Sequence, residues 1–358
     1  EDDSSVPAPD GPFAYATRFI EGAEQPRIVR TPRDGGAEEV LIDVDALAKG
    51  HAYYDLGGAD HSPDHALMAW SYDDKGSESY TLKVRDLATG DDLSDEIETT
   101  TGGAVWSADS RPLFYTDLDD NHRPCRIYRH RVGTAASEDV LVFEETNPGY
   151  FLGIGQTQSA RYLVVDSHEQ ETSEVHVIDA EAPDAAPLDH NGDVFYILTN
   201  ADGAEDFKIV TAPADAPGRE NWTDLVPHRP GRLILGVTLF KDFMVRLERE
   251  GGLPRIVIRA LASGEEHAIA FDEEAYSLGL SEGYEFDTTV LRFTYSSMTT
   301  PSRVYDYDMA ARTRVLRKEQ EVPSGHDASL YVTRRVFAPA HDGETVPVSL
   351  LYRKDTPL

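Results

Sequence analysis

Residues 62–91 read SPDHALMAWSYDDKGSESYTLKVRDLATGD, and residues 107–134 read SADSRPLFYTDLDDNHRPCRIYRHRVGT. Both stretches begin with a tight polar turn, continue as an alternating apolar strand, pass through a charged loop and end in another strand and turn. A repeat of this length that is made of several short strands is typical of radial β architectures. The pattern predicts a β-propeller, in which functional residues lie in loops rather than in the repeat.

Related units run along most of the chain, so we expect an all-β fold with seven blades, mostly of four antiparallel strands. One short helix is expected at Asp43–Lys49. The unit before His190 is about 12–18 residues shorter than the period predicts. We interpret this as residues missing from the sequence between Ala180 and His190.

The end of the chain differs from the repeats. Residues 1–320 form the expected propeller, and residues 321–330 resemble a linker. Residues 331–358 predict an isolated hairpin, with strands at Tyr331–Ala338 and Thr345–Arg353 around a turn at Asp342 and Gly343. A lone two-stranded ribbon is marginally stable in water. We therefore predict that the hairpin begins another domain, which the chain does not complete.

The composition is strongly acidic, with 65 acidic and 33 basic residues and a formal net charge of -32. Such a surface repels nucleic acids and anionic membranes and attracts cationic ligands. The single cysteine, Cys125, excludes an internal disulfide and favours a reducing compartment. We expect a cytoplasmic protein with no nucleic-acid or membrane partner. Solubility or adaptation to salt would produce the same acidity.

The sequence offers little that predicts catalysis or metal binding within the chain. We expect no G-x-S-x-G elbow of the kind that presents a serine nucleophile. His61 and His65 have a spacing that suits a helical metal site, but Pro63 prevents that helix. His122 and Cys125 are too few to hold a metal. We therefore expect no catalytic residue, no metal and no cofactor.

The loops between the second and third strands of the blades are the candidate functional features. In a propeller these loops emerge on one face, and in this chain most of them carry two or more carboxylates. Together they would form a negative vestibule that attracts a cationic ligand. Alternatively, they are exposed loops of a chain that is acidic throughout. The loops are residues 73–79, 117–124, 166–173, 200–206, 248–252 and 296–301.

Several segments resemble one peptidase family when taken together. They are DDKGSESYTLKVRDLATG (73–90), GGAVWSADSRPLFYTDLDDNHRPCRIYRHRVGT (102–134), PGRENWTDLVPHR (217–229), EREGGLPRIVI (248–258), YSSMTTPSRVYDYD (295–308) and VPVSLLYRKD (346–355). The family is the prolyl oligopeptidase family of serine peptidases, and the resemblance is to its oligopeptidase B group, also called protease II. It extends over nearly the whole chain.

The resemblance implies a two-domain endopeptidase. A seven-bladed propeller covers an α/β-hydrolase domain, admits only short peptides and gates access to a Ser-His-Asp triad. That triad would lie in the hydrolase domain, C-terminal to Leu358, so the chain alone is predicted to be inactive. Members of the oligopeptidase B group cleave after Arg or Lys, which implies short basic peptides and the hydrolase domain of the same polypeptide as partners. Cleavage after Pro is an alternative, and so is a free-standing propeller that binds peptide or protein.

The resemblance also implies that some acidic loops face the active site. The residues expected to line this vestibule are Asp117, Asp119, Asp120, Glu169, Glu171, Asp206 and Glu248. Arg123 is expected to form an interdomain ion pair.

Overall fold

The computed structural model describes residues 3–170, 172–180, 194–214, 216–281 and 283–357. These residues fall into two compact units, Glu1–Asp193 and Val194–Leu358. Both units are built from antiparallel sheets, so the prediction of an all-β chain is confirmed. No helix among the described residues has the length and apolar character needed to cross a membrane.

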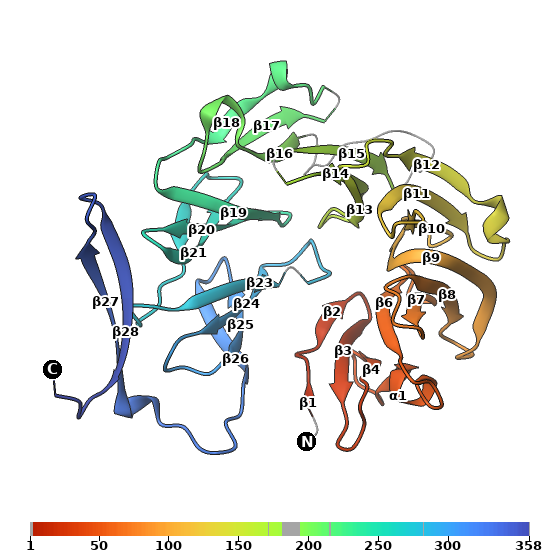
Figure 1. Ribbon diagram of the computed structural model, residues 1–358, viewed down its shortest axis with the longest axis horizontal. Helices are drawn as coiled ribbons and strands as arrows, with labels where there is room; N and C mark the ends of the chain where they lie inside the picture. The colour runs from red at the N-terminus through yellow and green to blue at the C-terminus, as the bar shows by residue number, and fades with distance from the viewer. Residues whose placement is uncertain (1–2, 171, 181–193, 215, 282, 358) are drawn as a thin grey trace. The chain divides into compact units, whose positions relative to one another are not determined.

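The first unit opens with a five-stranded sheet and one short helix (Figure 1). Asp43 caps the helix by accepting a hydrogen bond from the backbone N–H of Ala46 at 3.0 Å, as is usual for Asp at this position. The helix lies within the predicted segment. The elements are β1 (Asp3–Ser4), β2 (Ala8–Asp10), β3 (Phe13–Phe19), β4 (Arg27–Pro32), β5 (Glu39–Asp43) and α1 (Val44–Leu47).

A seven-stranded sheet follows, and its central strand β9 is fifteen residues long. The first part of β9 pairs with β8 and the last part pairs with β10. Between these parts Thr99 and Gly102 adopt positive φ values of 62° and 94°, so the strand changes direction without ending. The strands are β6 (Asp55–His61), β7 (Leu67–Asp73), β8 (Tyr80–Asp86), β9 (Asp92–Trp106), β10 (Pro112–Leu118), β11 (Pro124–Arg131) and β12 (Val140–Glu144), with a 3₁₀ turn η1 at Ala136–Glu138.

A three-stranded sheet completes the described part of the first unit, and apolar clusters join its sheets. This sheet contains β13 (Phe151–Gln156), β14 (Tyr162–His168) and β15 (Ser173–Asp179). Tyr15 and Ile42 pack with Trp70 between the first two sheets. Phe114 packs with Leu163 between the second and third. These contacts bury alternate residues of the strands, as expected for sheets packed face to face.

The second unit contains three further sheets before the end of the chain. Phe243 and Phe293 belong to one cluster, which packs two of these sheets together. The elements are β16 (Val194–Thr199), η2 (Ala201–Gly203), β17 (Lys208–Pro213), η3 (Arg219–Asn221), β18 (Thr223–Val226), β19 (Arg232–Leu239), β20 (Phe243–Glu250), β21 (Leu253–Ala260), β22 (Glu266–Ala268), β23 (Ser277–Ser281), β24 (Val290–Ser296), β25 (Arg303–Asp308), β26 (Thr313–Glu319) and η4 (Ala328–Leu330).

The final sheet is a hairpin of two strands, β27 (Tyr331–Pro339) and β28 (Thr345–Arg353), at the predicted place. Its apolar side chains stay exposed, and Phe337 keeps 60% of its surface in contact with solvent. Arg334 forms an ion pair with Glu274 at 2.9 Å, and the backbone N–H of Arg335 donates to the same carboxylate at 2.8 Å. The hairpin is therefore attached to its unit by polar contacts.

The prediction of seven mostly four-stranded blades is wrong. Before the hairpin, the described strands form five sheets of three to five strands, each the size of one blade, and one sheet of seven strands. The physical reason is β9, which continues from one expected unit into the next. The predicted gap between Ala180 and His190 falls on residues 181–193, which lie outside the described residues.

Candidate functional site

Two of the acidic loops of the first unit lie together. The loop between β7 and β8 and the loop between β10 and β11 line one pocket of about 290 Å³. Ser79 belongs to the first loop, Asp119 and Asp120 belong to the second, and Thr99 of β9 lines the same pocket. Asp120 is exposed, whereas Asp117 is half-buried and accepts hydrogen bonds from Thr99 and Arg126 at 2.9 and 3.3 Å.

Each of these loops is organised around its first aspartate. Asp119 accepts hydrogen bonds from the backbone N–H groups of Arg123 and Asn121 at 3.1 and 2.8 Å, and these bonds keep its pKa below the usual range. Burial disfavours ionisation of Asp73, but N–H groups of Lys75 and Glu78 donate to it and lower its pKa overall. Both carboxylates are therefore ionised and hold their loops in shape.

Arg123 uses its guanidinium within its own unit. Nη1 donates to the carbonyl oxygens of Asn147 and Tyr150 at 3.1 and 3.0 Å, and Nε contacts Asp119 at 3.2 Å. The side chain is 16% exposed. It joins the loop between β10 and β11 to the segment between β12 and β13. Its predicted interdomain ion pair stays a prediction.

The other predicted vestibule residue of the first unit that is described is Glu169. Its Oε1 accepts hydrogen bonds from the backbone N–H and the hydroxyl of Thr172 at 2.8 and 3.0 Å. The hydroxyl of Thr172 also contacts that of Tyr150 at 2.7 Å. The loop is thereby brought near the segment that Arg123 holds. Glu171 lies outside the described residues.

The two candidates in the second unit have different surroundings. Asp206 precedes β17 and accepts a hydrogen bond from the backbone N–H of Gly231 at 2.7 Å. Glu248 lies within β20 and is 2% exposed, so its predicted position in a solvent-facing loop is wrong. It accepts a hydrogen bond from Arg246 at 2.9 Å, which is equally buried. Glu248 belongs to a buried ion pair.

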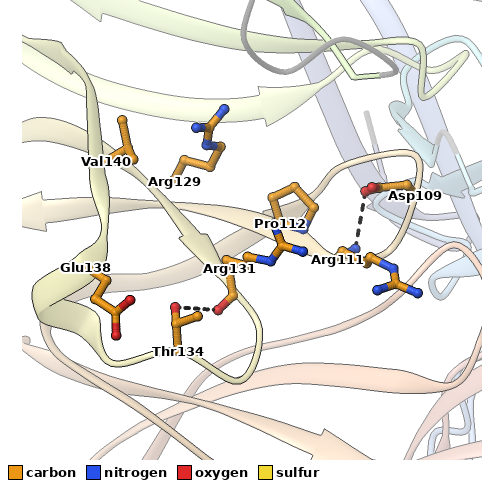
Figure 2. Close-up of a pocket in the computed structure, with 8 residues that line it drawn as sticks. All are labelled: Asp109, Arg111, Pro112, Arg129, Arg131, Thr134, Glu138 and Val140. Carbon is orange, nitrogen blue, oxygen red and sulfur yellow. Dashed lines mark hydrogen bonds between the residues drawn. The ribbon is translucent and has the colours of Figure 1, made fainter.

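Positive charge gathers at the opposite end of the same strands. Arg111, Arg129 and Arg131 line a pocket of about 450 Å³, together with Asp109 and Glu138 (Figure 2). Arg111 precedes β10 and Asp119 follows it. A strand of seven residues separates its ends by about 20 Å. The seven-stranded sheet therefore has a mixed, arginine-rich end and an acidic end.

The expectation that the chain has no G-x-S-x-G sequence is wrong, because one is present at Gly279–Gly283. Ser281 is exposed at the end of β23, which pairs with β24. Among the described residues no histidine forms a hydrogen bond with its hydroxyl, and no helix follows the strand. An α/β-hydrolase elbow needs a strand, a sharp turn and a helix. The described residues around Ser281 therefore lack the parts of a nucleophile elbow.

His61 and His65 do come together, although the sequence argued against a shared metal. They lie on either side of the turn between β6 and β7, and Asp10 of the first sheet joins them. Helical spacing was the wrong test, since a strand followed by a tight turn also brings these positions together. Asp10 gave no signal in the sequence.

Comparison with known proteins places these features in a family. Residues 1–320 match the family described as prolyl oligopeptidase, N-terminal beta-propeller domain. The dipeptidyl aminopeptidase BI of Pseudoxanthomonas mexicana is 38% identical over 386 residues, covering 99% of this chain and 53% of that protein. Protease 2 of Moraxella lacunata is 28% identical over 374 residues, covering 98% of this chain and 53% of that protein.

Solved structures give the same result. Oligopeptidase B from Leishmania major superimposes with a TM-score of 0.92 at 29% identity, over 99% of this chain and 54% of that one. Oligopeptidase B from Trypanosoma brucei, in a closed form with covalently bound antipain, superimposes with a TM-score of 0.90 at 30% identity. The match covers 100% of this chain and 54% of that one. The predicted resemblance to the oligopeptidase B group is confirmed.

The chain spans about half the length of the curated relatives that it matches. The match over residues 1–320 confirms that these sheets form a β-propeller. The chain belongs to the prolyl oligopeptidase family of serine peptidases and carries the family's N-terminal propeller domain.

Proposed function

We propose that this chain is the non-catalytic, substrate-gating propeller of a cytoplasmic serine endopeptidase that cleaves short peptides after Arg or Lys. The observation that carries the proposal is the acidic end of the seven-stranded sheet, where the loops after β7 and β10 share one pocket. The opposite end of β10 and β11 carries three arginines together with Asp109 and Glu138. A peptide with Arg or Lys side chains would be attracted to the acidic end.

The division of the chain into domains is part of this proposal. Residues 321–330 would link the propeller to a hydrolase domain of the same polypeptide, and residues 331–358 would begin that domain. The exposed apolar side chains of β27 and β28 support this, because a following domain would cover them. Arg123 would lie near the interface between the domains.

The isolated chain is expected to hydrolyse no peptide, because the Ser-His-Asp triad would lie in the hydrolase domain. The measurement is release of a fluorophore from an N-blocked Arg-amide by the purified chain, with titration by an active-site-directed phosphonate. Turnover that scales with a titratable serine would contradict the proposal.

Asp120→Lys in the full-length enzyme is expected to reduce kcat/KM for a dibasic peptide by about 2–5-fold at low ionic strength, because exposed charge pairs contribute about 0.2–1 kcal/mol. The difference should disappear at high salt. Asp120 is suitable because it is exposed, whereas Asp119 holds its loop. Glu138→Lys, at the other end of the sheet, is the matched control. Equal salt dependence in both variants would leave the acidic loops with a role in solubility only.

A second candidate activity is removal of dipeptides from free amino termini, because a relative with 38% identity is named dipeptidyl aminopeptidase BI. Carboxylates of the acidic loops would then bind the substrate's terminal ammonium group. The full-length enzyme should be assayed on X-Arg-amide with a free and with a blocked amino terminus. Cleavage of the blocked substrate supports an endopeptidase, and cleavage of the free one alone supports the second activity. A Pro-amide tests the prolyl specificity in the same assay.

A further inference from the structure

Three potential metal ligands converge in the first unit at a place unrelated to the acidic loops. One ligand atom each from Asp10, His61 and His65 lies within 4.8 Å of the other two. Oδ2 of Asp10 and Nε2 of His61 are 2.7 Å apart. The His61 side chain is 7% exposed and that of Asp10 is 28% exposed. This is a partly enclosed set of two imidazoles and one carboxylate.

Local backbone structure explains why the ligands meet. His61 ends β6, and the chain turns through residues 62–65 with a hydrogen bond from the N–H of His65 to the carbonyl of Ser62 at 2.8 Å. His65 has a φ of 60°, which few non-glycine residues adopt. Asp10 ends β2, and Gly11 follows it with a φ of 49°. Each turn holds a ligand against the other sheet.

Gly11 allows one of the ligands, His65, to approach the backbone closely. A Cβ atom on residue 11 would lie 2.5 Å from Nε2 of His65, which is closer than such contacts occur. Any other residue at this position would fill the space beside that nitrogen. The lack of a side chain therefore lets the His65 ring pack against the turn that carries Asp10.

Surrounding groups orient the imidazoles. The hydroxyl of Tyr15 and Nδ1 of His65 are 2.8 Å apart, and the Tyr15 ring stacks on His61 at 3.8 Å. When Nδ1 of His65 donates to Tyr15, Nε2 keeps the lone pair that a metal needs. Two cations lie nearby. Arg33 donates to the backbone carbonyl of Gly11 at 2.9 Å, and Arg30 donates to that of His65 at 2.7 Å and pairs with Glu39 at 2.7 Å. Glu39 offsets the Arg30 charge.

We propose that Asp10, His61 and His65 bind a zinc ion, with a water molecule as the fourth ligand. Two imidazoles and one carboxylate are a donor set that zinc accepts. In a tetrahedral zinc site, neighbouring ligand atoms are about 3.3 Å apart. Oδ2 of Asp10 and Nε2 of His61 would separate slightly, and the more distant atoms would move closer by small side-chain rotations.

Zinc at this place would tie two sheets together. Asp10 belongs to the five-stranded sheet, whereas His61 and the turn with His65 belong to the seven-stranded sheet. A metal that binds only when both sheets are in place stabilises their packing. The proposal is independent of peptidase activity, since none of its residues belongs to the acidic loops.

The test is calorimetric titration of the metal-free 358-residue chain with zinc chloride, supported by thermal unfolding with and without zinc. We expect one saturable zinc site per chain and a higher Tm with zinc. Asp10→Asn and His65→Ala should each reduce zinc affinity more than about tenfold, and Tyr15→Phe should reduce it by about 10–100-fold as a positioning residue. Cobalt should give visible absorption bands of a four-coordinate ion, which a surface carboxylate site does not give.

The matched control is His168→Ala, which removes an exposed histidine 2.8 Å from Asp166. It should leave zinc binding unchanged. Circular dichroism and metal-free Tm values identify variants that fail to fold, and Asp10→Asn keeps the shape of the side chain. Absence of a saturable site, or an affinity that Asp10→Asn and His65→Ala leave unchanged, would overturn the proposal.

Discussion

Replacing Arg246 by methionine is expected to reduce the free energy of unfolding of the second unit by about 3–5 kcal/mol, the usual effect of breaking a buried ion pair from one side. Arg246 is 2% exposed and donates to Glu248 at 2.9 Å and to Glu266 at 2.8 Å. Burial disfavours its charge, but hydrogen bonds to Glu266 and Glu248 raise its pKa overall. Without Arg246, the buried carboxylate of Glu248 would keep only the more distant guanidinium of Arg232, at 4.0 Å.

The second substitution Glu248→Leu should restore most of the loss, because the double variant removes both charges of the closest buried pair. Glu266 keeps a partner in Arg259 at 2.9 Å. Urea unfolding followed by the fluorescence of Trp222, which lies in this unit, measures both effects. Arg353→Met removes an exposed pair with Asp355 and should cost at most about 1 kcal/mol. A loss for Arg246→Met no larger than this would show that the pair is not effectively buried.

Replacing His130 by phenylalanine is the second substitution with a large expected effect, a loss of about 3–5 kcal/mol from the first unit. The His130 side chain is fully buried between two carboxylates, with Nδ1 2.7 Å from Asp139 and Nε2 2.8 Å from Asp95. Tyr115 donates to the other oxygen of Asp139 at 2.9 Å. Two acceptors on one ring favour the imidazolium, and phenylalanine would leave both carboxylates without a counter-charge.

The buried triad of Asp95, His130 and Asp139 also makes the stability of the first unit depend on pH. Burial opposes the charge of His130, but hydrogen bonds to Asp95 and Asp139 raise its pKa above 6.5. The stabilisation that charged His130 contributes is therefore complete below about pH 6.5. It is lost as the pH rises through the pKa of His130 in the folded protein. Burial opposes ionisation of Asp95, but hydrogen bonds from His130 and Gly133 lower its pKa below 3.8. The stabilisation that ionised Asp95 contributes is lost only when the pH falls through this lowered pKa.

Stability from the triad should therefore be greatest between about pH 4 and pH 6.5. Asp95→Asn combined with Asp139→Asn should remove the decline above pH 6.5, because the neutral ring then has neutral partners. Urea unfolding of both proteins at pH 6 and pH 8.5, followed by Trp106 fluorescence, measures the difference. Parallel pH profiles would mean that His130 is neutral in the folded protein.

Local chemistry explains which parts of the fold were predictable. The turns that open the two quoted repeats each contain a Ser and an Asp two residues later. In both, the Ser hydroxyl donates to the Asp at 2.6 Å, from Ser62 to Asp64 and from Ser107 to Asp109. Such turns depend on neighbouring residues alone. The terminal hairpin was predictable for the same reason, with Gly343 at a φ of 92° in its turn.

The errors concern partners that lie far away in the sequence. Glu248 follows Arg246 at strand spacing, so both side chains lie on one face of β20, and their burial depends on Glu266 of a neighbouring strand. Nothing in EREGG indicates an interior position. Asp10 meets His61 only because two sheets pack together. Composition predicted charged loops, but it could not show which carboxylates hold their own loops in shape.

The continuous strand β9 has a consequence for how the first unit opens. Two sheets that are joined only by a loop can unfold one at a time, because the loop couples the opening of one sheet only weakly to that of the other. β9 instead carries backbone hydrogen bonds to β8 and to β10 within one strand. If β9 separates from β8, its hydrogen bonds to β10 must therefore weaken as well, and the reverse also holds. The hydrogen-bonded amide protons of strands β6 to β12 should exchange with solvent deuterium as one cooperative block, so proteases would find no early cleavage site within β9.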